Sequence, residues 1–293
     1  HAISKSFDEK KILDQFEYNF LKGERIGIIG KNGTGKSTFL NMITGNIAPD
    51  KGKVVIGDTV KFGYYTQKGI HIKEGQKVID VVREFGDFIP LKKGRQISAQ
   101  QLLERFLFDR KKQYDFVDKL SGGERKRLYL CTVLIKNPNF LILDEPTNGL
   151  DPQGIHQIRG IIQKIASQGT TILLASHLLD EVEKVCTHVV VLSKGKSLYV
   201  GRVEQMNASF GFVTLQCSDM PGLKKVLEES TSFENIKQDA AYLVANLTQE
   251  MDAAKLNAFL FEKGITLSHL VQRKESLEEK FLALTQNPAQ TNN

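Results

Sequence analysis

The chain has 293 residues, of which 41% are hydrophobic and 25% charged, and its formal net charge is +6. These proportions are typical of a soluble globular protein, and no window approaches the roughly 18 consecutive apolar residues that a membrane helix needs. The three cysteines are far apart in apolar or mixed segments, which favours buried reduced thiols over a disulfide or metal framework and indicates a cytosolic compartment.

The charge is divided unevenly between two parts of the chain. Residues 209–293 contain 8 Lys or Arg and 11 Asp or Glu, a balance of −3, which leaves +9 for residues 1–208. A basic surface could serve ATP, RNA or acidic lipid headgroups, although a solvated charged face is the commoner explanation. The length predicts two domains, at residues 1–208 and 209–293. The beginning, HAISKSF, has neither an initiator Met nor a targeting pattern, so we interpret it as a trimmed start near the first strand.

Hydrophobic patterning predicts strands alternating with helices in the first domain. The expected strands cover residues 3–7, 12–20, 25–29, 52–67, 140–143 and 170–176, with a closing hairpin of 189–192 and 197–200. The expected helices cover residues 37–44, 78–85, 99–108, 121–136 and 155–167, and those within about residues 70–136 form a helical subdomain. Continuously apolar strands between helices predict an α/β fold with a parallel core sheet covered on both faces, to which antiparallel strands are added.

The second domain has a different pattern. Strands are expected at residues 212–217, 242–247 and 267–272, and helices at 220–229, 253–263 and 276–284. This order suggests a small α+β accessory domain, with a ferredoxin-like arrangement among the candidates. It contains no catalytic constellation.

A glycine-rich loop follows the predicted strand at residues 25–29. It reads GKNGTGKS, and with the next residue it supplies nine candidate nucleotide-binding residues: Gly30, Lys31, Asn32, Gly33, Thr34, Gly35, Lys36, Ser37 and Thr38. Glycines let the backbone wrap phosphate oxygens, while Lys36 reaches the β- and γ-phosphates and Ser37 binds Mg²⁺. The alternative is a simple glycine turn before a helix.

Two adjacent carboxylates end the apolar strand at residues 140–143. Asp144 is expected to hold the metal, and Glu145 to polarise a water for attack on the γ-phosphate. The alternative is a pair that caps the helix after Pro146. With Glu145 present, the sequence predicts hydrolysis of ATP in addition to binding.

The stretch LSGGE at Leu120–Glu124 lies between these two motifs, and in this order the set resembles the ATP-binding cassette (ABC) ATPases over residues 1–208. The resemblance implies that Ser121, Gly122 and Gly123 complete the ATP site of an opposite cassette, because this chain already has its own phosphate loop. Residues Asn148 to Asp151 (NGLD) then resemble a loop that runs along that head-to-tail interface.

The same resemblance assigns three further residues. Gln67 is expected to contact Mg²⁺ and the attacking water, and His177 to contact the γ-phosphate, so that both act in catalysis with Lys36 and Glu145. Phe7, 23 residues before Gly30, is expected to stack on adenine. The alternatives are an ordinary polar residue for Gln67, a satisfied core histidine for His177 and a core aromatic for Phe7.

Two relatives are visible within the chain. Residues 1–148 are similar to ABC-F proteins, which are ribosome-associated ATPases with two cassettes, whereas only one of each motif occurs here. Residues 149–293 are similar to ATP-binding subunits of bacterial exporters, through segments such as GLDPQGIHQIRGII and SLEEKFLAL. The chain is therefore either a composite sequence joined near residue 148 or an unusual natural cassette.

These resemblances imply an ATPase that requires ATP and Mg²⁺ and closes as a head-to-tail dimer with a second copy or a related cassette. As an exporter motor it would act in the cytoplasm at the inner face of the cell membrane, bound to an integral-membrane permease and without a membrane span of its own. One alternative is an ABC-F ATPase that acts on the ribosome and its RNA. The other is a non-catalytic nucleotide-binding regulator.

Overall fold

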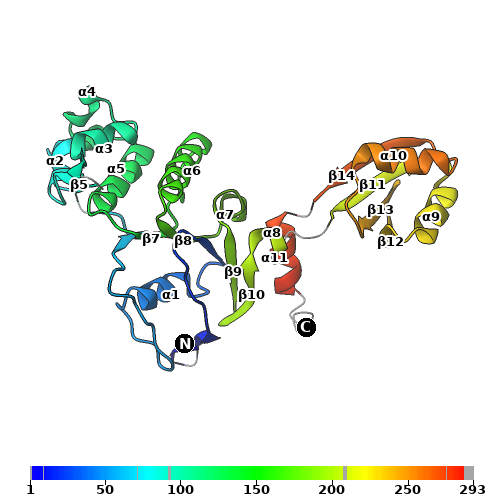
Figure 1. Cartoon of the computed structure of the whole chain (residues 1–293), viewed down its shortest axis with the longest axis horizontal. Helices are drawn as coiled ribbons and strands as arrows, with labels where there is room; N and C mark the ends of the chain where they lie inside the picture. Colours follow the sequence, from blue (N-terminus) through cyan, green and yellow to red (C-terminus); the bar gives the residue numbers. More distant parts are fainter. Residues whose placement is uncertain are drawn as a thin grey trace. The chain divides into compact units, whose positions relative to one another are not determined.

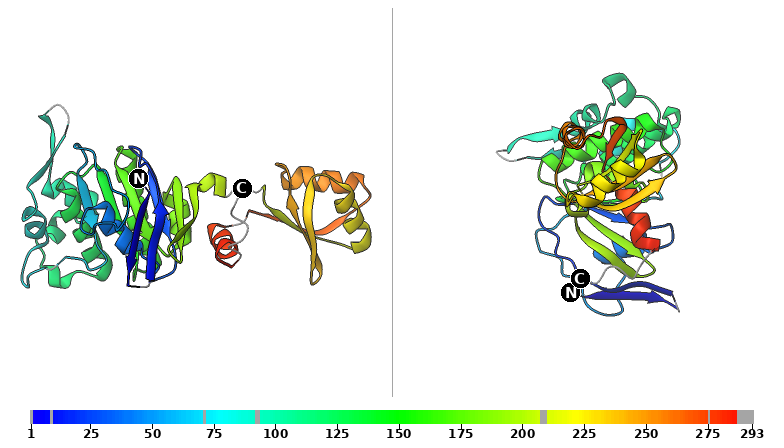
Figure 2. Two further views of the ribbon diagram at one scale, coloured as in Figure 1. Left: turned by 90° about the horizontal axis from the view of Figure 1, so that it is seen from below. Right: turned by 90° about the vertical axis from the view of Figure 1, so that its right-hand side faces the viewer.

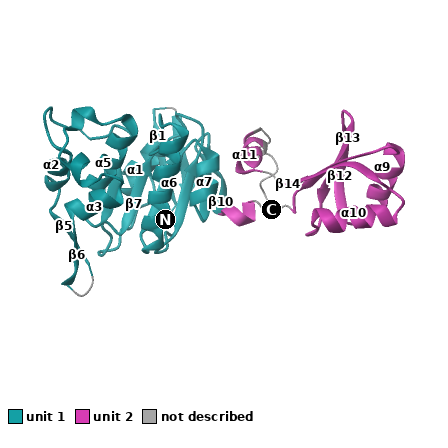
Figure 3. Cartoon of the chain, turned by 90° about the horizontal axis from the view of Figure 1, so that it is seen from above, with its two compact units in different colours: residues 1–201, 291–293 teal, residues 202–290 magenta. Residues whose placement is uncertain are grey.

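The structure is a computed structural model that describes residues 2–8, 10–70, 72–91, 94–206, 210–274 and 276–286 (Figure 1). The chain divides into two compact units (Figure 3). Unit 1 is formed by residues 1–201 and unit 2 by residues 202–290. Within the described residues, no helix is both long enough and apolar enough to cross a membrane.

The centre of unit 1 is a sheet whose described strands follow the order β10-β9-β3-β8-β7-β4. They are β3 (Arg25–Ile29), β4 (Phe62–Tyr65), β7 (Phe140–Asp144), β8 (Thr171–Ser176), β9 (His188–Ser193) and β10 (Lys196–Arg202). The pairs β4–β7, β7–β8, β8–β3 and β3–β9 are parallel, which confirms the predicted α/β fold with a parallel core. Parallel strands end at the same edge of a sheet, so the residues after β3, β7 and β8 meet there.

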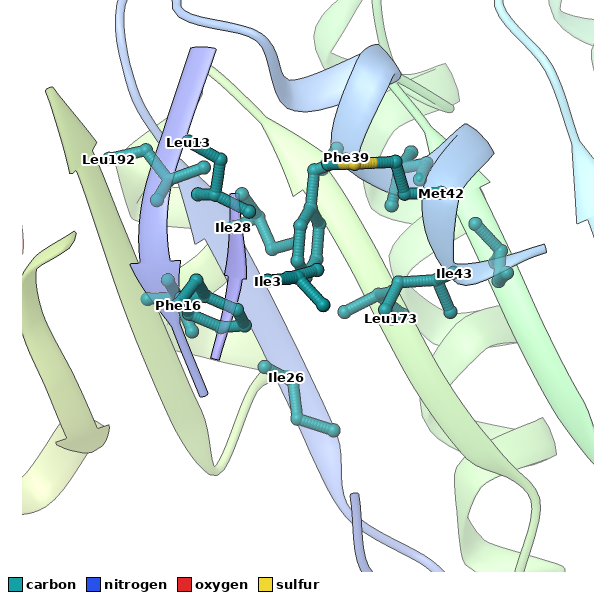
Figure 4. Close-up of a cluster of buried hydrophobic side chains, with 14 of the residues drawn as sticks. Ile3, Leu13, Phe16, Ile26, Ile28, Phe39, Met42, Ile43, Leu173 and Leu192 are labelled. Atoms are coloured by element: carbon teal, nitrogen blue, oxygen red, sulfur yellow. The ribbon is translucent and has the colours of Figure 1, made fainter. Parts of the chain in front are cut away.

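Both faces of the sheet are covered. One face carries α1 (Lys36–Ile43) and an antiparallel ribbon of β1 (Ile3–Phe7) and β2 (Lys10–Phe16), drawn dark blue in Figure 2. Side chains of all three elements join Ile26 and Ile28 of β3 in one buried cluster (Figure 4). Side chains alternate along a strand, so Gly27 faces the opposite side. There it meets α7 (Leu179–Val185), which packs beside α6 (Pro152–Ser167).

A subdomain lies between β4 and β7 in the chain. Its helical elements are α2 (Val78–Arg83), α3 (Ala99–Arg105), α4 (Arg110–Gln113), the 3₁₀ turn η2 (Val117–Lys119) and α5 (Gly122–Leu134). It also contains an antiparallel hairpin of β5 (Phe88–Pro90) and β6 (Gln96–Ser98), which the sequence pattern did not predict. The strand predicted over residues 52–67 was too long, because a turn closed by Val60 N–H donating to the Gly57 carbonyl (3.0 Å) leaves only β4 in the sheet.

Unit 2 contains the α+β domain that the sequence predicted. Its order is β11 (Phe212–Cys217), α9 (Met220–Glu229), β12 (Phe233–Asp239), β13 (Tyr242–Leu247), α10 (Ala253–Glu262) and β14 (Leu267–Arg273). The described strands form an antiparallel sheet in the order β12-β13-β11-β14, which is a ferredoxin-like arrangement. The sequence pattern missed β12, because this edge strand is mostly exposed and its sequence FENIKQD is largely polar. Two helices complete the unit, α8 (Val203–Met206) and α11 (Leu277–Gln286), and Lys280 of α11 donates to the Met206 carbonyl.

The approach of α7 to β3 depends on Gly27. A Cβ atom at this position would lie 2.2 Å from Cγ1 of Val182 and 3.2 Å from Sγ of Cys186. We expect Gly27→Ala to destabilise unit 1 by about 1–3 kcal/mol, because the strand and the helix must separate. Gly160→Ala in α6 is the control, since a Cβ there meets nothing within 4 Å. It should be neutral or stabilise by up to about 1 kcal/mol, and urea unfolding of both variants would compare them. Equal loss in both would contradict the packing argument.

Candidate functional site

The glycine-rich loop joins β3 to α1 at the carboxyl edge of the sheet. Gly33 and Gly35 have φ angles of 77° and 99°, which glycine adopts without strain. Gly35 begins α1 without a side-chain cap, so the first amides of the helix are free to bind an anion. The ammonium of Lys36 folds back over the loop and donates to the Gly30 carbonyl at 2.9 Å. This backbone can surround a phosphate group, and the alternative of a simple turn does not account for the buried ammonium above it.

Glu145 links the loop to the strand ends. In the β7–β8 register Asp144 pairs with Ala175, and Glu145 N–H continues the pairing by donating to the Ala175 carbonyl at 2.9 Å. Its Oε1 lies 3.4 Å from Nζ of Lys36 and its Oε2 lies 2.7 Å from Nδ1 of His177, while only 7% of the carboxylate side chain is exposed. The predicted base, the loop lysine and the histidine therefore meet in one cluster. With a side chain 38% exposed, His177 is not a core histidine.

Asp144 is a buried carboxylate with unused bonding capacity. It is 4% exposed, and its Oδ1 has no hydrogen-bond partner among the described residues. Burial raises the pKa of Asp144 above its ordinary value, the charge of Glu145 raises it further, and the Ser37 hydroxyl and the Lys36 charge oppose the rise. A carboxylate oxygen beside a serine hydroxyl and an amide side chain is the oxygen-rich donor set that Mg²⁺ prefers. The residues present thus fit a magnesium ion.

A cavity of about 500 Å³ contains most of the predicted site. Its described lining includes ten of the predicted residues: Asn32, Gly33, Gly35, Lys36, Ser37, Thr38, Gln67, Asp144, Glu145 and His177. Gln67 lies in the segment after β4. The loop, both carboxylates and the glutamine therefore line the same cavity. Its volume suits a ligand the size of a nucleotide.

Three predicted residues of the loop are absent from the described lining. Gly30 is buried, and a Cβ atom on it would lie 2.7 Å from the Leu192 carbonyl oxygen and from Thr34 Oγ1. Thr34 donates its hydroxyl to the Lys31 carbonyl at 2.8 Å, and Lys31 itself is exposed. Gly30 and Thr34 thus support the conformation of the loop without lining the cavity.

Phe7 lies outside the described lining but near the loop. It is 45% exposed, so it is not the core aromatic that was its alternative. Its cross-strand partner is Lys10, whose ammonium donates to the Gly33 carbonyl at 3.1 Å. The β1–β2 ribbon therefore brings the exposed ring to the end of the ribbon next to the phosphate loop.

The LSGGE residues, which we call the signature, belong to a surface separate from the cavity. Ser121 caps α5, and it forms a capping box with Glu124 in which Glu124 Oε2 accepts from Ser121 N–H at 2.8 Å. A Cβ atom on Gly122 would meet nothing within 4 Å, and one on Gly123 would meet only a Leu150 methyl at 3.6 Å. Ser121, Gly122 and Gly123 are not among the described residues of the cavity. Packing within the chain therefore gives no reason for glycine at position 122.

Asp151 is also outside the described cavity lining. Its side chain caps α6, accepting from Gly154 N–H at 2.7 Å. The alternative proposed for Asp144 and Glu145, capping the helix after Pro146, is thus wrong, because Asp151 performs that function.

Three further residues belong to the site, although none of them was predicted to lie at the ATP cavity. Ile12 lines the cavity and would lie 2.3 Å from a Cβ atom at Gly35, and Lys10 bonds the loop as described above. Asn148 lines this cavity and an adjoining one of about 570 Å³, and its carbonyl accepts from Lys126 of α5. Ile12 and Lys10 come from a ribbon with no motif, so only the folded chain reveals them. Asn148 had a signal, since it directly follows the DEPT segment.

Comparison with known proteins identifies the family. Residues 13–148 match the ABC transporter family model. The chain is 30% identical to the daunorubicin resistance ATP-binding protein DrrA3 of Streptomyces coeruleorubidus, over 97% of this chain and 94% of that protein. This chain belongs to the ABC transporter family. Its prediction as an ABC ATPase is therefore confirmed.

Two other relatives show how the similarity is distributed. The uncharacterized ABC transporter ATP-binding protein YfmR of Bacillus subtilis is 43% identical over 177 residues, but the match covers 60% of this chain and only 28% of that protein. The Nod factor export ATP-binding protein I of Bradyrhizobium diazoefficiens is 28% identical over 97% of this chain and 94% of that protein. Both parts of this ABC chain thus align with a single relative. The names of these relatives do not mention ABC-F proteins, so that part of the prediction gains no support.

A solved structure supports the fold. The ATP-binding cassette MJ0796, solved as a dimer bound to ADP and Pi, superposes with a TM-score of 0.55 at 21% identity. The match covers 69% of this ABC chain and 97% of MJ0796. The cassette architecture of the ATP-binding unit is therefore confirmed.

Replacement of Asp144 should stabilise the folded protein at neutral pH. Because burial raises the folded pKa of Asp144 above its unfolded pKa, ionisation costs folding free energy that grows as the pH rises from the unfolded pKa and is complete above the folded pKa. We expect Asp144→Asn to raise the melting temperature of the ligand-free ABC protein at pH 7.5, and this gain should shrink toward pH 4, near the unfolded pKa. Thermal unfolding at several pH values measures it. Ser37→Ala is the control, because it removes an opposing hydrogen bond and should not stabilise. A gain independent of pH would contradict the prediction.

Proposed function

We propose that this chain is the ATP-binding and ATP-hydrolysing subunit of an ABC exporter. The observation that carries the proposal is the contact of Glu145 with both Lys36 and His177 in the cavity that the glycine-rich loop lines. A binding regulator would need the loop and the lysine but not a buried carboxylate held by a histidine. The relatives named for daunorubicin resistance and Nod factor export align over nearly the whole chain and support the exporter setting.

In the proposed reaction the loop amides and Lys36 bind the phosphates of ATP. Lys36 exchanges its contacts with Gly30 and Glu145 for phosphate oxygens, which leaves Oε1 of Glu145 facing the cavity. Ser37, Asp144 and Gln67 would hold Mg²⁺, which when bound would neutralise charge on the phosphates. Phe7 is placed to stack on adenine.

Glu145 then acts as the general base. Its carboxylate accepts a proton from a water molecule as the water oxygen bonds to the γ-phosphorus and the bond to the bridging oxygen breaks. His177 holds the carboxylate through its 2.7 Å bond to Oε2, so Oε1 is directed at the water. The products are ADP and inorganic phosphate.

The site is completed by a second chain. Among the described residues, a Cβ atom on Gly122 would meet nothing within 4 Å, and the helix N-terminus that Gly122 begins is a favourable anion site. We infer that Ser121, Gly122 and Gly123 contact the γ-phosphate bound by the opposite cassette, and that Asp151 lies along the interface. The MJ0796 cassette, which has a similar fold, was solved as a dimer, and this supports the proposed pairing. The proposed setting is the inner face of the cell membrane, where closing and opening of the dimer would act on a separate permease.

Glu145→Gln should keep ATP binding and lose hydrolysis. The amide keeps the shape of the carboxylate but cannot accept the proton, so kcat should fall by about 10²–10⁴-fold. In the presence of ATP the variant should then accumulate as a dimer, which size-exclusion chromatography resolves from the monomer. Lys36→Ala is the contrast, because it should weaken ATP binding itself. Unchanged phosphate release by Glu145→Gln would show that Glu145 is not the general base.

A mixing experiment tests whether the site is shared. Gly122→Asp places a negative charge where the opposite γ-phosphate should lie, yet it should leave the monomer folded because the position is open and the helix N-terminus favours an acid. Alone, Gly122→Asp and Lys36→Ala should both be inactive. A mixed dimer has one site with an intact loop and an intact signature, so mixing should restore up to about a quarter of wild-type activity. Gly122→Ala is the size control. Activity of Gly122→Asp alone would indicate that α5 does not contribute to ATP hydrolysis.

A further inference from the structure

Among the residues of unit 2 that the structure describes, helices cover one face of the sheet. Both α9 and α10 contribute leucines to the same buried cluster, together with Val213 and Leu215 of β11 and Leu243 of β13. The side chains between these positions point to the other face, since direction alternates along a strand. Within the described residues of unit 2, no helix packs on that second face. We call it the open face.

The open face has an apolar and aromatic centre. The register places Val244, Thr214 and Val271 side by side across β13, β11 and β14, and all three are half-buried. In the next row the rings of Tyr242 and His269 lie 4.8 Å apart. A centre of this kind gains free energy when a partner covers it.

Opposite charges stand at the two edges of the open face. One row runs from Glu234 on β12 through Asn246 and Phe212 to Arg273 on β14. Three strand spacings separate Glu234 from Arg273, about 14 Å, so they cannot pair within one chain. Neither has an ion-pair partner among the described residues, and both are exposed. The row is therefore charged at both ends and neutral in the middle.

We propose that the open face pairs with the open face of a second copy of this chain. A two-fold axis parallel to the strands, passing between β13 and β11, exchanges the two edges of the sheet. Glu234 of each copy then faces Arg273 of the other, so the pair forms two ion pairs. In the Tyr242 row the same operation brings Asp239 opposite His269 of the second copy. Lys237, in the middle row, lies opposite Val271 of the second copy at the edge of the sheet, where its ammonium can stay in water.

The charge pattern favours a copy over a nucleic acid. Residues 209–293 carry a balance of −3, whereas a phosphate backbone requires a surplus of Lys and Arg. The open face has both signs at fixed positions, and the two-fold rotation places Glu234 of one copy opposite Arg273 of the other. A second copy is thus the partner that the face matches.

The size of the face sets how strongly it pairs. Four strands of about six residues give a flat patch of about 400 Å² on each copy. The two patches together bury about 800 Å², which is less than the roughly 1,000 Å² that a stable interface between free proteins needs. The pairing therefore rests on the proposed function, in that ATP-bound cassettes hold two chains together and raise the local concentration of the two open faces.

Cross-linking in the Glu145→Gln full chain with ATP tests the pairing. Thr214→Cys lies beside the axis, and a bis-maleimide of about 10 Å suits the spacing of facing sheets, which exceeds the reach of a disulfide. We expect a cross-linked dimer from Thr214→Cys and none from Lys225→Cys, on the exposed surface of α9. The native cysteines are buried, and the chain without an added cysteine measures their background.

Charge reversal then tests the axis. Glu234→Arg or Arg273→Glu should each lower the cross-linking of Thr214→Cys by about fivefold, since each places like charges opposite one another. The two together should restore it, and Glu250→Arg, outside the open face, should leave it unchanged. A dimer on size exclusion with no cross-link, or a cross-link indifferent to charge reversal, would overturn this inference alone. Absence of any ATP-dependent dimer would overturn it together with the proposed function.

Discussion

The functional site depends on the parallel register of three strands. Because β3, β7 and β8 run in the same direction, the loop after β3, the carboxylates after β7 and the histidine after β8 emerge at one edge of the sheet. A slip of one residue in the β7–β8 pairing would turn Asp144 to the other face. The apolar side chains of these strands hold the register, since most of them are completely buried. The core therefore determines the geometry of the chemistry.

The cluster of Lys36, Glu145 and His177 is conformationally strained and leaves polar atoms unpaired, and the function explains why. Glu145 adopts a φ of 51°, which is unfavourable for a residue with a side chain, and its Oε1 has no hydrogen-bond partner among the described residues. Asp144 beside it is also buried with an unpaired oxygen. Strain and unsatisfied polar groups at the same place are typical of sites that complete their interactions with a ligand.

Much of the fold was accessible from the sequence. The strands at residues 25–29 and 140–143 were predicted because continuous apolar runs can only be buried, and the loop at Gly30–Ser37 because few other structures use that spacing of glycines. The predictions failed where local pattern and tertiary contacts differ. The segment at residues 52–61 has strand-forming residues but turns back at Gly57, and β12 is a strand although its residues are polar, since it pairs at an exposed edge.

The sequence by itself determined the chemistry of this ABC protein, because the residue types of the loop, the carboxylate pair and LSGGE are fixed by what phosphate and metal require. Only the tertiary structure decided which of them meet. It joined Lys36, Glu145 and His177 in one cavity, and left Gly122 on a separate surface with open space around it. It also brought Lys10 to the loop from a ribbon without a motif. The reason is physical: distances between side chains far apart in sequence are set by strand pairing and core packing, and no local pattern encodes them.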